Sequence, residues 1–129
     1  MFDLEPDEAR LLLNIALMAV GSNRFRSAAN ILAALERFRP DHPSVAVAKA
    51  VALMSAGDFE TAVGYIDGNA LRRFPASDML KAFKGMALVR LGRKDEARPA
   101  LEAASRSTDD PAAAKLAGDI LNSWRIEEL

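Results

Sequence analysis

The 129-residue sequence contains no cysteine and only one histidine. Without cysteine the chain cannot form disulfides, thiolate zinc sites or a thiol nucleophile. A single histidine excludes a metal site built from several histidines, and the place of His42 between two prolines predicts an exposed turn residue. No glycine-rich phosphate loop is present. The pairs of adjacent acids stand where helices should begin, where they favour the helix dipole. We therefore expect no catalytic residue, no metal and no cofactor in a protein that is not an enzyme.

The sequence also lacks an excess of charge of one sign and a long hydrophobic run. Its 17 basic and 18 acidic residues give a net charge of −1, which argues against nucleic acid as a partner because such binders are basic. The early uncharged run, residues 11–23, is shorter than the roughly 18 apolar residues that a spanning helix needs. Residues 1–8 are acidic where a signal peptide would be basic. We expect a cytoplasmic protein that does not insert into membranes.

Strand signals are scarce, whereas residues that favour helices are abundant. The chain has 25 alanines and 16 leucines, both strong helix formers. The sequence therefore predicts an all-α protein. We expect helices at about residues 6–20, 25–38, 43–56, 59–71, 77–91, 95–107 and 111–126. Pro99 falls inside the sixth of these helices and should bend it or delay its start.

Five residues are expected to mark helix ends. Asp41, Ser77 and Asp110 stand where a side-chain oxygen can cap the first backbone N–H groups of a helix. Gly57 and Gly92 stand at helix C-termini, where glycine accepts left-handed backbone without strain.

Equivalent residues recur about every 35 positions. Pro40, Pro75 and Pro111 are 35 and 36 residues apart, and Gly57 and Gly92 are 35 apart. An internal period of this length is typical of stacked helical repeats. Each unit should consist of a helix, a turn with glycine or asparagine, a second helix, and a turn that contains proline.

The order of small residues within each unit resembles the tetratricopeptide repeat. That repeat has a small residue in its first helix, a glycine turn, an aromatic residue, an alanine, and a closing proline. The three units here have Ala16, Asn23, Phe25, Ala28 and Pro40; Ala50, Gly57, Phe59, Ala62 and Pro75; and Gly85, Gly92, Lys94, Ala97 and Pro111. Lys94 departs from the pattern because it replaces the aromatic residue. The second and third units also run one or two residues long before their prolines.

The resemblance implies a domain organisation as well as a fold. It implies one right-handed solenoid domain over residues 1–129, with three helix-turn-helix repeats and a C-terminal capping helix. The expected repeats span residues 9–42, 43–77 and 78–110, and the capping helix spans residues 111–127.

The first helix of each unit carries more apolar residues than one buried face requires. In the repeat's geometry this helix lines a concave groove. The expected groove residues, none of them polar, are Leu13, Leu17, Val20, Val47, Val51, Met54, Met79, Ala82, Met86 and Val89. Such a groove cannot clamp a terminal carboxylate, as other members of the family do, and should instead hold the apolar face of an amphipathic helix. The alternative is that these residues are core.

Residues 71–98 hold eight basic and three acidic residues, a local net charge of +5. One interpretation is a basic patch that steers an acidic partner, with Arg90 and Arg93 as its main residues. The alternative is an ordinary solvated helix surface.

A narrower resemblance rests on residues 39–43, 74–78 and 81–82. These segments look like those of the small tetratricopeptide proteins of bacterial type III secretion systems. The resemblance implies a chaperone or assembly adaptor that shields a polymerisation-prone helix of a secreted protein, such as a needle subunit, together with a small co-chaperone. The alternative is a structural scaffold that buries the same groove against a second copy of itself.

Overall fold

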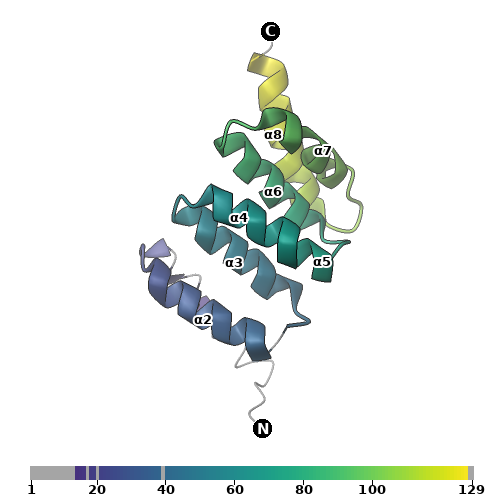
Figure 1. The fold of residues 1–129 in the computed structure, drawn as a ribbon. Coiled ribbons are helices and arrows are strands. Elements are labelled where there is room, and N and C mark those ends of the chain that lie inside the picture. Colours follow the sequence, from purple (N-terminus) through teal and green to yellow (C-terminus); the bar gives the residue numbers. More distant parts are fainter. Residues whose placement is uncertain (1–13, 17, 20, 39, 128–129) are drawn as a thin grey trace. The chain divides into compact units, whose positions relative to one another are not determined.

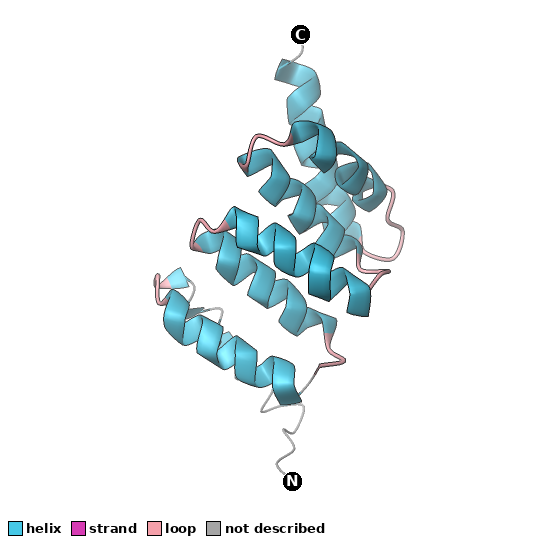
Figure 2. Ribbon diagram, viewed as in Figure 1, coloured by secondary structure: helices cyan, strands magenta, loops and turns pink. Residues whose placement is uncertain are grey.

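The computed structural model describes residues 14–16, 18–19, 21–38 and 40–127, and these residues form helices and turns without any strand (Figures 1 and 2). The all-α prediction is confirmed. Residues 14–16, 18, 19 and 21 are helical. The later elements are α2 (Phe25–Phe38), α3 (Pro43–Ser55), α4 (Phe59–Tyr65), the π-helix η1 (Ile66–Ala70), α5 (Leu71–Arg73), α6 (Asp78–Arg90), α7 (Lys94–Ser105) and α8 (Pro111–Glu127).

The chain divides into two compact units, unit 1 within residues 1–58 and unit 2 within residues 59–129. The boundary falls between α3 and α4, inside the second expected repeat. The single-domain organisation and the expected repeat bounds stay predictions.

Most predicted helices agree with the structure to within two residues, and helical backbone also covers the predicted helix at 59–71, although it is not α-helical throughout. It is interrupted by the π-helix, in which the Leu71 N–H bonds to the carbonyl of Ile66, five residues back. Most of the helix predicted at 6–20 lies outside the described residues. The late start suggested for the sixth helix is wrong, because α7 begins at Lys94 and contains Pro99.

Left-handed backbone occurs at the turn between the two helices of each of the three expected repeats. Gly57 has φ 79° and Gly92 has φ 76°, which confirms both predicted helix ends. Asn23 takes the same place in the first repeat, with φ 61°. Asparagine tolerates this conformation better than most residues, which explains how it replaces glycine here.

Two of the three predicted caps are confirmed. Ser77 Oγ accepts the Leu80 N–H at 3.3 Å, and Asp110 Oδ1 accepts the Ala113 N–H at 3.1 Å. The third prediction is wrong, because His42 rather than Asp41 occupies the N-cap position of α3. The side chain of His42 makes no hydrogen bond to the helix. The next residue is a proline at the first helical position, where its fixed φ favours the helix and its missing N–H needs no partner. Because α3 begins at this proline, Asp41 lies one residue before the N-cap position.

Unit 1 has a core built from the helical residues before Gly21 together with α2 and α3. Its buried members are Ala16, Ala28, Leu32, Leu35, Val45, Ala48 and Ala52. Lys49 on α3 and Glu36 on α2 add an ion pair of 3.0 Å between the two helices.

Unit 2 is arranged around α6, which packs against α4, η1, α7 and α8 (Figure 1). Helix α6 approaches α7 closely at Gly85, where a Cβ atom would lie 2.5 Å from Leu101 Cδ2. The recurrent alanines Ala62 and Ala97 are fully buried. Small residues therefore stand at buried positions where the repeat pattern placed them.

Candidate partner-binding surfaces

One face of α6 stays partly open although the helix packs on several sides. Met79, Phe83 and Met86 are half-buried, and Arg90 is exposed. They follow one another at spacings of four, three and four residues, which places them on one face of a helix. We call these four residues the α6 stripe. The stripe is apolar along two turns and ends in a positive charge.

A second partly open face lies on α3 in unit 1. Val47, Val51 and Met54 are half-buried, and exposed Ser44 and Ser55 lie beside them. We call the three apolar residues the α3 stripe. Val47, Val51 and Met54 follow one another at spacings of four and three residues, so they too share one face of a helix.

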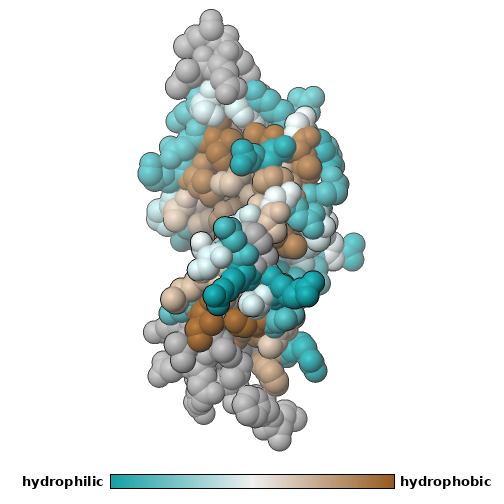
Figure 3. Space-filling model, turned by 90° about the vertical axis from the view of Figure 1, so that its left-hand side faces the viewer, coloured by the Kyte–Doolittle hydropathy of each residue, from teal (hydrophilic) through white to brown (hydrophobic). Residues whose placement is uncertain are grey.

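Apolar side chains reach the surface of unit 2 on the face drawn in Figure 3, where brown patches are bordered by hydrophilic residues. An apolar surface of this kind, rimmed by polar groups, is typical of a site that binds another molecule.

The charged residues near α6 are mostly engaged in pairs within unit 2. Lys84 Nζ lies 2.8 Å from Asp67 Oδ1, and Lys81 Nζ lies 3.5 Å from Asp78 Oδ1. Asp78 is already counted in the local net charge of +5, but Asp67 lies outside residues 71–98. The carboxylate of Asp67 therefore makes this surface less basic than the sequence count suggests.

Arg93 is held by two carboxylates. Its Nη2 donates to Glu96 Oε1 at 2.9 Å, and its Nη1 lies 3.3 Å from Glu60 Oε1. The hydrogen bond to Glu96 raises the pKa of Arg93, and the same bond lowers the pKa of Glu96 below its ordinary value. The two carboxylates offset the charge of Arg93, which leaves less of it to steer a partner.

Arg90 differs from these cations. Its guanidinium carbon lies 5.5 Å from the centroid of the Phe59 ring, and its side chain is exposed. Among the residues that the structure describes, Arg90 has no acidic partner.

A model of the tetratricopeptide repeat matches residues 13–78, 47–111 and 84–123, which together span most of the chain. The chain belongs to the tetratricopeptide repeat family. No curated protein and no solved structure matches it. Repeats of this family are protein–protein interaction modules and act in general as binding scaffolds without enzymatic activity, so the two stripes are candidate contacts for a protein partner.

Within this tetratricopeptide repeat chain, three predicted groove residues lie outside the described residues, six are half-buried and one is fully buried. Leu13, Leu17 and Val20 lie outside the described residues. Those that are half-buried on α3 or α6 are Val47, Val51, Met54, Met79, Met86 and Val89. Whether they contact a partner stays a prediction.

Ala82 is a correction. It is fully buried, so its methyl group packs inside the protein and cannot contact a partner. The groove prediction also missed Phe83, which is four residues after Met79 and three before Met86. The helical period alone was sufficient to find it.

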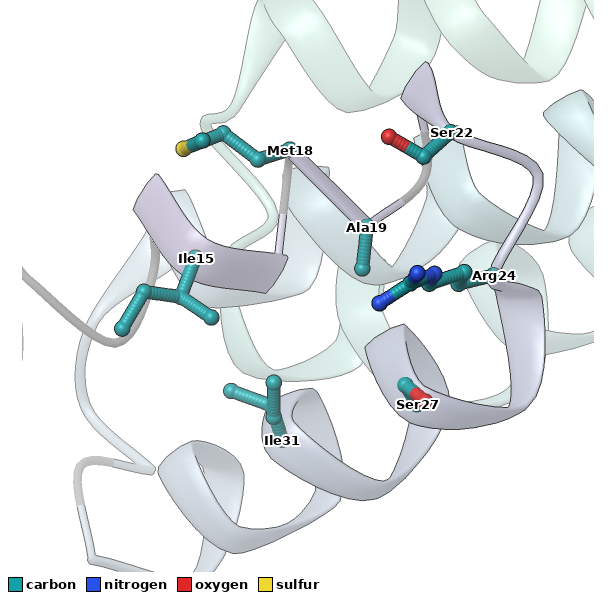
Figure 4. Close-up of a pocket in the computed structure, with 7 residues that line it drawn as sticks. All are labelled: Ile15, Met18, Ala19, Ser22, Arg24, Ser27 and Ile31. Atoms are coloured by element: carbon teal, nitrogen blue, oxygen red, sulfur yellow. The ribbon is translucent and has the colours of Figure 1, made fainter.

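Unit 1 of the tetratricopeptide repeat protein has a hollow of about 300 Å³ that sequence reasoning did not predict (Figure 4). Its lining residues come from the helical residues before Gly21, from the turn that follows, and from α2: Ile15, Met18, Ala19, Ser22, Arg24, Ser27 and Ile31. Met18 is 71% exposed and Ile15 is 41% exposed. The apolar excess of residues 11–20 was the signal for this surface.

The described ranges of the chain hold neither a cluster of metal ligands nor a helix that could span a membrane. No group of three or more histidine, aspartate or glutamate side chains is placed to hold a metal ion there. None of the helices in that part of the chain is both long and apolar enough to span a bilayer. His42 is exposed in its turn, as its sequence position predicted.

Proposed function

We propose that this tetratricopeptide repeat protein binds an amphipathic helix of a partner protein through the α6 stripe, as a cytosolic chaperone or assembly adaptor. The observation that carries the proposal is the open face of α6, where Met79, Phe83 and Met86 stand in one row without a charged neighbour between them. Helix-in-groove recognition uses apolar anchors at the same spacing of three, four and seven residues. The α3 stripe offers unit 1 a surface of the same kind.

The side chains of the stripe suit a binding surface that must accept more than one arrangement of its partner. Methionine is flexible and polarisable, and it packs against irregular apolar surfaces. Burial of the remaining exposed part of each large side chain would contribute about 1 kcal/mol. Three such contributions give only weak binding, so contacts beyond the apolar row must add to the affinity.

The partner class that we propose is a secreted or assembly component of a type III secretion system, such as a needle subunit. The likeness of residues 39–43 and 74–78 to the small chaperones of these systems supports this choice. A chaperone of this kind would cover the apolar face through which the partner polymerises. A second small co-chaperone would cover the rest of the partner or part of this protein.

Substitution of Met86 by glutamate tests the proposal. An open position keeps the new carboxylate hydrated in the free protein, so Met86→Glu should cost under about 1 kcal/mol of folding free energy. The complex would bury an unpaired charge, so co-purification with a co-expressed needle subunit should be lost. Val51→Glu applies the same test to the α3 stripe.

Leu101→Glu is the matched control, because Leu101 is fully buried against α6. This variant should lose its cooperative thermal transition. If Met86→Glu melts as poorly as Leu101→Glu, Met86 is core and the binding proposal fails. If the purified protein forms a homodimer that persists on dilution and that Met86→Glu dissociates, the scaffold function replaces the chaperone function.

A further inference from the structure

The α6 stripe ends in Arg90, which differs from the neighbouring cations in its lack of a carboxylate partner among the described residues. Lys81 and Lys84 on the same helix have carboxylates within 3.5 Å, and Arg93 in the next turn has two. Arg90 has none among the described residues, although its side chain is exposed at the end of an apolar row. An arginine in this position is available to a carboxylate that arrives from outside the chain.

The contact with Phe59 holds Arg90 in place without neutralising it. A cation over an aromatic face is attracted to the ring's quadrupole, but the net charge of the guanidinium remains. Phe59 is the first residue of α4 and is itself half-buried, so its ring is fixed by the helix that packs beside α6. Less side-chain entropy is then lost when the guanidinium meets an anion, which favours binding.

The geometry of an α-helix sets the distances along the stripe. Met79 and Met86 are seven residues apart, about 10 Å at 1.5 Å per residue, and Arg90 lies about 6 Å further along the axis. A partner helix that places apolar anchors over the two methionines therefore brings the residue one turn beyond its last anchor close to Arg90.

We propose that the partner helix of the α6 stripe carries a carboxylate one turn beyond one end of its apolar face, and that this carboxylate pairs with Arg90. This inference rests on the proposed function and adds a requirement for an acidic residue in the partner helix. A helix with the same apolar face but without the acid would bind more weakly. The charge would also fix the direction in which the helix lies along α6.

Synthetic helical peptides test the proposal without knowledge of the natural partner. Three peptides share one leucine face and differ at its ends: one has glutamate one turn before the face, one has glutamate one turn after it, and one has glutamine at both places. Binding to the full-length protein is measured by fluorescence anisotropy at low and at physiological salt. The protein variants are Arg90→Gln, Arg90→Lys and Arg72→Gln. Arg72 is the matched control, since it is an exposed arginine on α5.

One of the two glutamate peptides should bind about three- to tenfold more tightly than the glutamine peptide. Arg90→Gln should abolish this advantage, Arg90→Lys should restore part of it, and Arg72→Gln should leave it unchanged. Added salt should reduce it, because exposed charges are screened over about 8 Å at physiological ionic strength. Which glutamate peptide gains affinity reports the direction of the bound helix.

Two negative results have different meanings. If all three peptides bind equally, with an affinity that falls in Met86→Glu but not in Arg90→Gln, the role of Arg90 is wrong while the apolar stripe stands. If no peptide binds, or if binding is insensitive to Met86→Glu, the proposed function fails and this inference fails with it.

Discussion

At the scale of single residues, Gly85 controls the contact between α6 and α7. A Cβ atom there would lie 2.5 Å from both Cγ and Cδ2 of Leu101, far inside normal contact distance. Leu101 is fully buried, and close-packed protein interiors leave few voids into which a side chain can move. The absence of a side chain at Gly85 thus sets how closely the two helices can approach.

The first prediction is that Gly85→Ala destabilises the protein by about 1–3 kcal/mol, because overpacking of the core outweighs the roughly 1 kcal/mol that alanine gains in helix propensity. Gly118→Ala on α8 is the control, since a Cβ at Gly118 meets no heavy atom within 4 Å. That variant should be as stable as wild type or more stable. Urea unfolding measures both, and equal stability of the two variants would contradict the close approach.

The second prediction concerns pH and the pair formed by Arg93 and Glu96. The pKa of Glu96 is lowered in the folded state, chiefly by the hydrogen bond from Arg93. A lowered folded-state pKa adds stability above the unfolded-state pKa, and this stability is lost as pH falls through the folded-state pKa. Glu96→Gln should therefore melt below wild type at pH 7, and the difference should shrink below about pH 4.

Melting curves of both proteins at a series of pH values check this prediction. Asp119→Asn is a control with a more exposed ion pair, formed with Lys115 at 3.2 Å on α8. Glu96 accepts two hydrogen bonds from one guanidinium, and the amide in Glu96→Gln keeps only one acceptor oxygen for them. A melting difference that is the same at pH 3 and pH 7 would assign the effect of Glu96→Gln to packing rather than charge.

At the scale of elements, the π-helix explains an irregularity in the repeat spacing. The left-handed turns at Asn23 and Gly57 are 34 residues apart, whereas those at Gly57 and Gly92 are 35 apart. The second interval contains η1, in which the helix holds one more residue per hydrogen-bonded turn. The extra residue is absorbed inside a helix, so the residues on either side keep the faces that they need for packing.

The third prediction follows from this arrangement. Deletion of Gly68, which is exposed and has no neighbour near its Cα hydrogens, should convert the π-helix into a regular α-helix and leave the protein folded. Deletion of the exposed Asp119 from α8 should be far more damaging, because it rotates buried Trp124 by about 100°. Circular dichroism and thermal melting compare the two deletions. A Gly68 deletion that unfolds the protein would contradict this account.

The sequence predicted the helices and their turns well because local chemistry decides them. Proline, left-handed glycine and a capping serine or aspartate act within a few residues, so Gly57, Gly92, Ser77 and Asp110 could be assigned without tertiary information. The π-helix could not be assigned, because it reflects a mismatch between repeat length and packing rather than a local preference.

The binding surface was harder to predict than the fold. The helical period of α6 identifies Met79, Phe83 and Met86 as one row, but it does not say how deeply neighbouring helices cover that row. Ala82 was assigned to the groove for this reason, although it is fully buried. The net charge of residues 71–98 was likewise counted without Glu60 and Asp67, which lie outside that stretch and pair with Arg93 and Lys84.

At the scale of the whole molecule, the chain consists of two compact units with separate sets of core residues. In unit 2, α6 is packed by four elements that all lie after residue 58. Trp124 on α8 is nearly buried, with Lys94 Nζ 4.8 Å and the Arg98 guanidinium carbon 5.3 Å from its ring centroid. These contacts tie the C-terminal helix to α7 within the unit.

The fourth prediction is that residues 59–129 fold without unit 1. The isolated segment should be helical and should unfold cooperatively in urea, because its helices bury their apolar faces against one another. Trp124→Ala is the control. It should lower the stability of the full chain and of the segment by a similar 3–5 kcal/mol. A segment that is helical but melts without a cooperative transition would show that unit 2 depends on unit 1.

The methionines give the binding surfaces a sensitivity to oxidants. The chain has no cysteine, and the methionines that the structure describes all reach solvent: Met18, Met54, Met79 and Met86. Oxidation to the sulfoxide makes an apolar side chain polar. Mild peroxide should therefore weaken the binding of an apolar helix at a dose that leaves the melting temperature nearly unchanged, and methionine sulfoxide reductase should restore it.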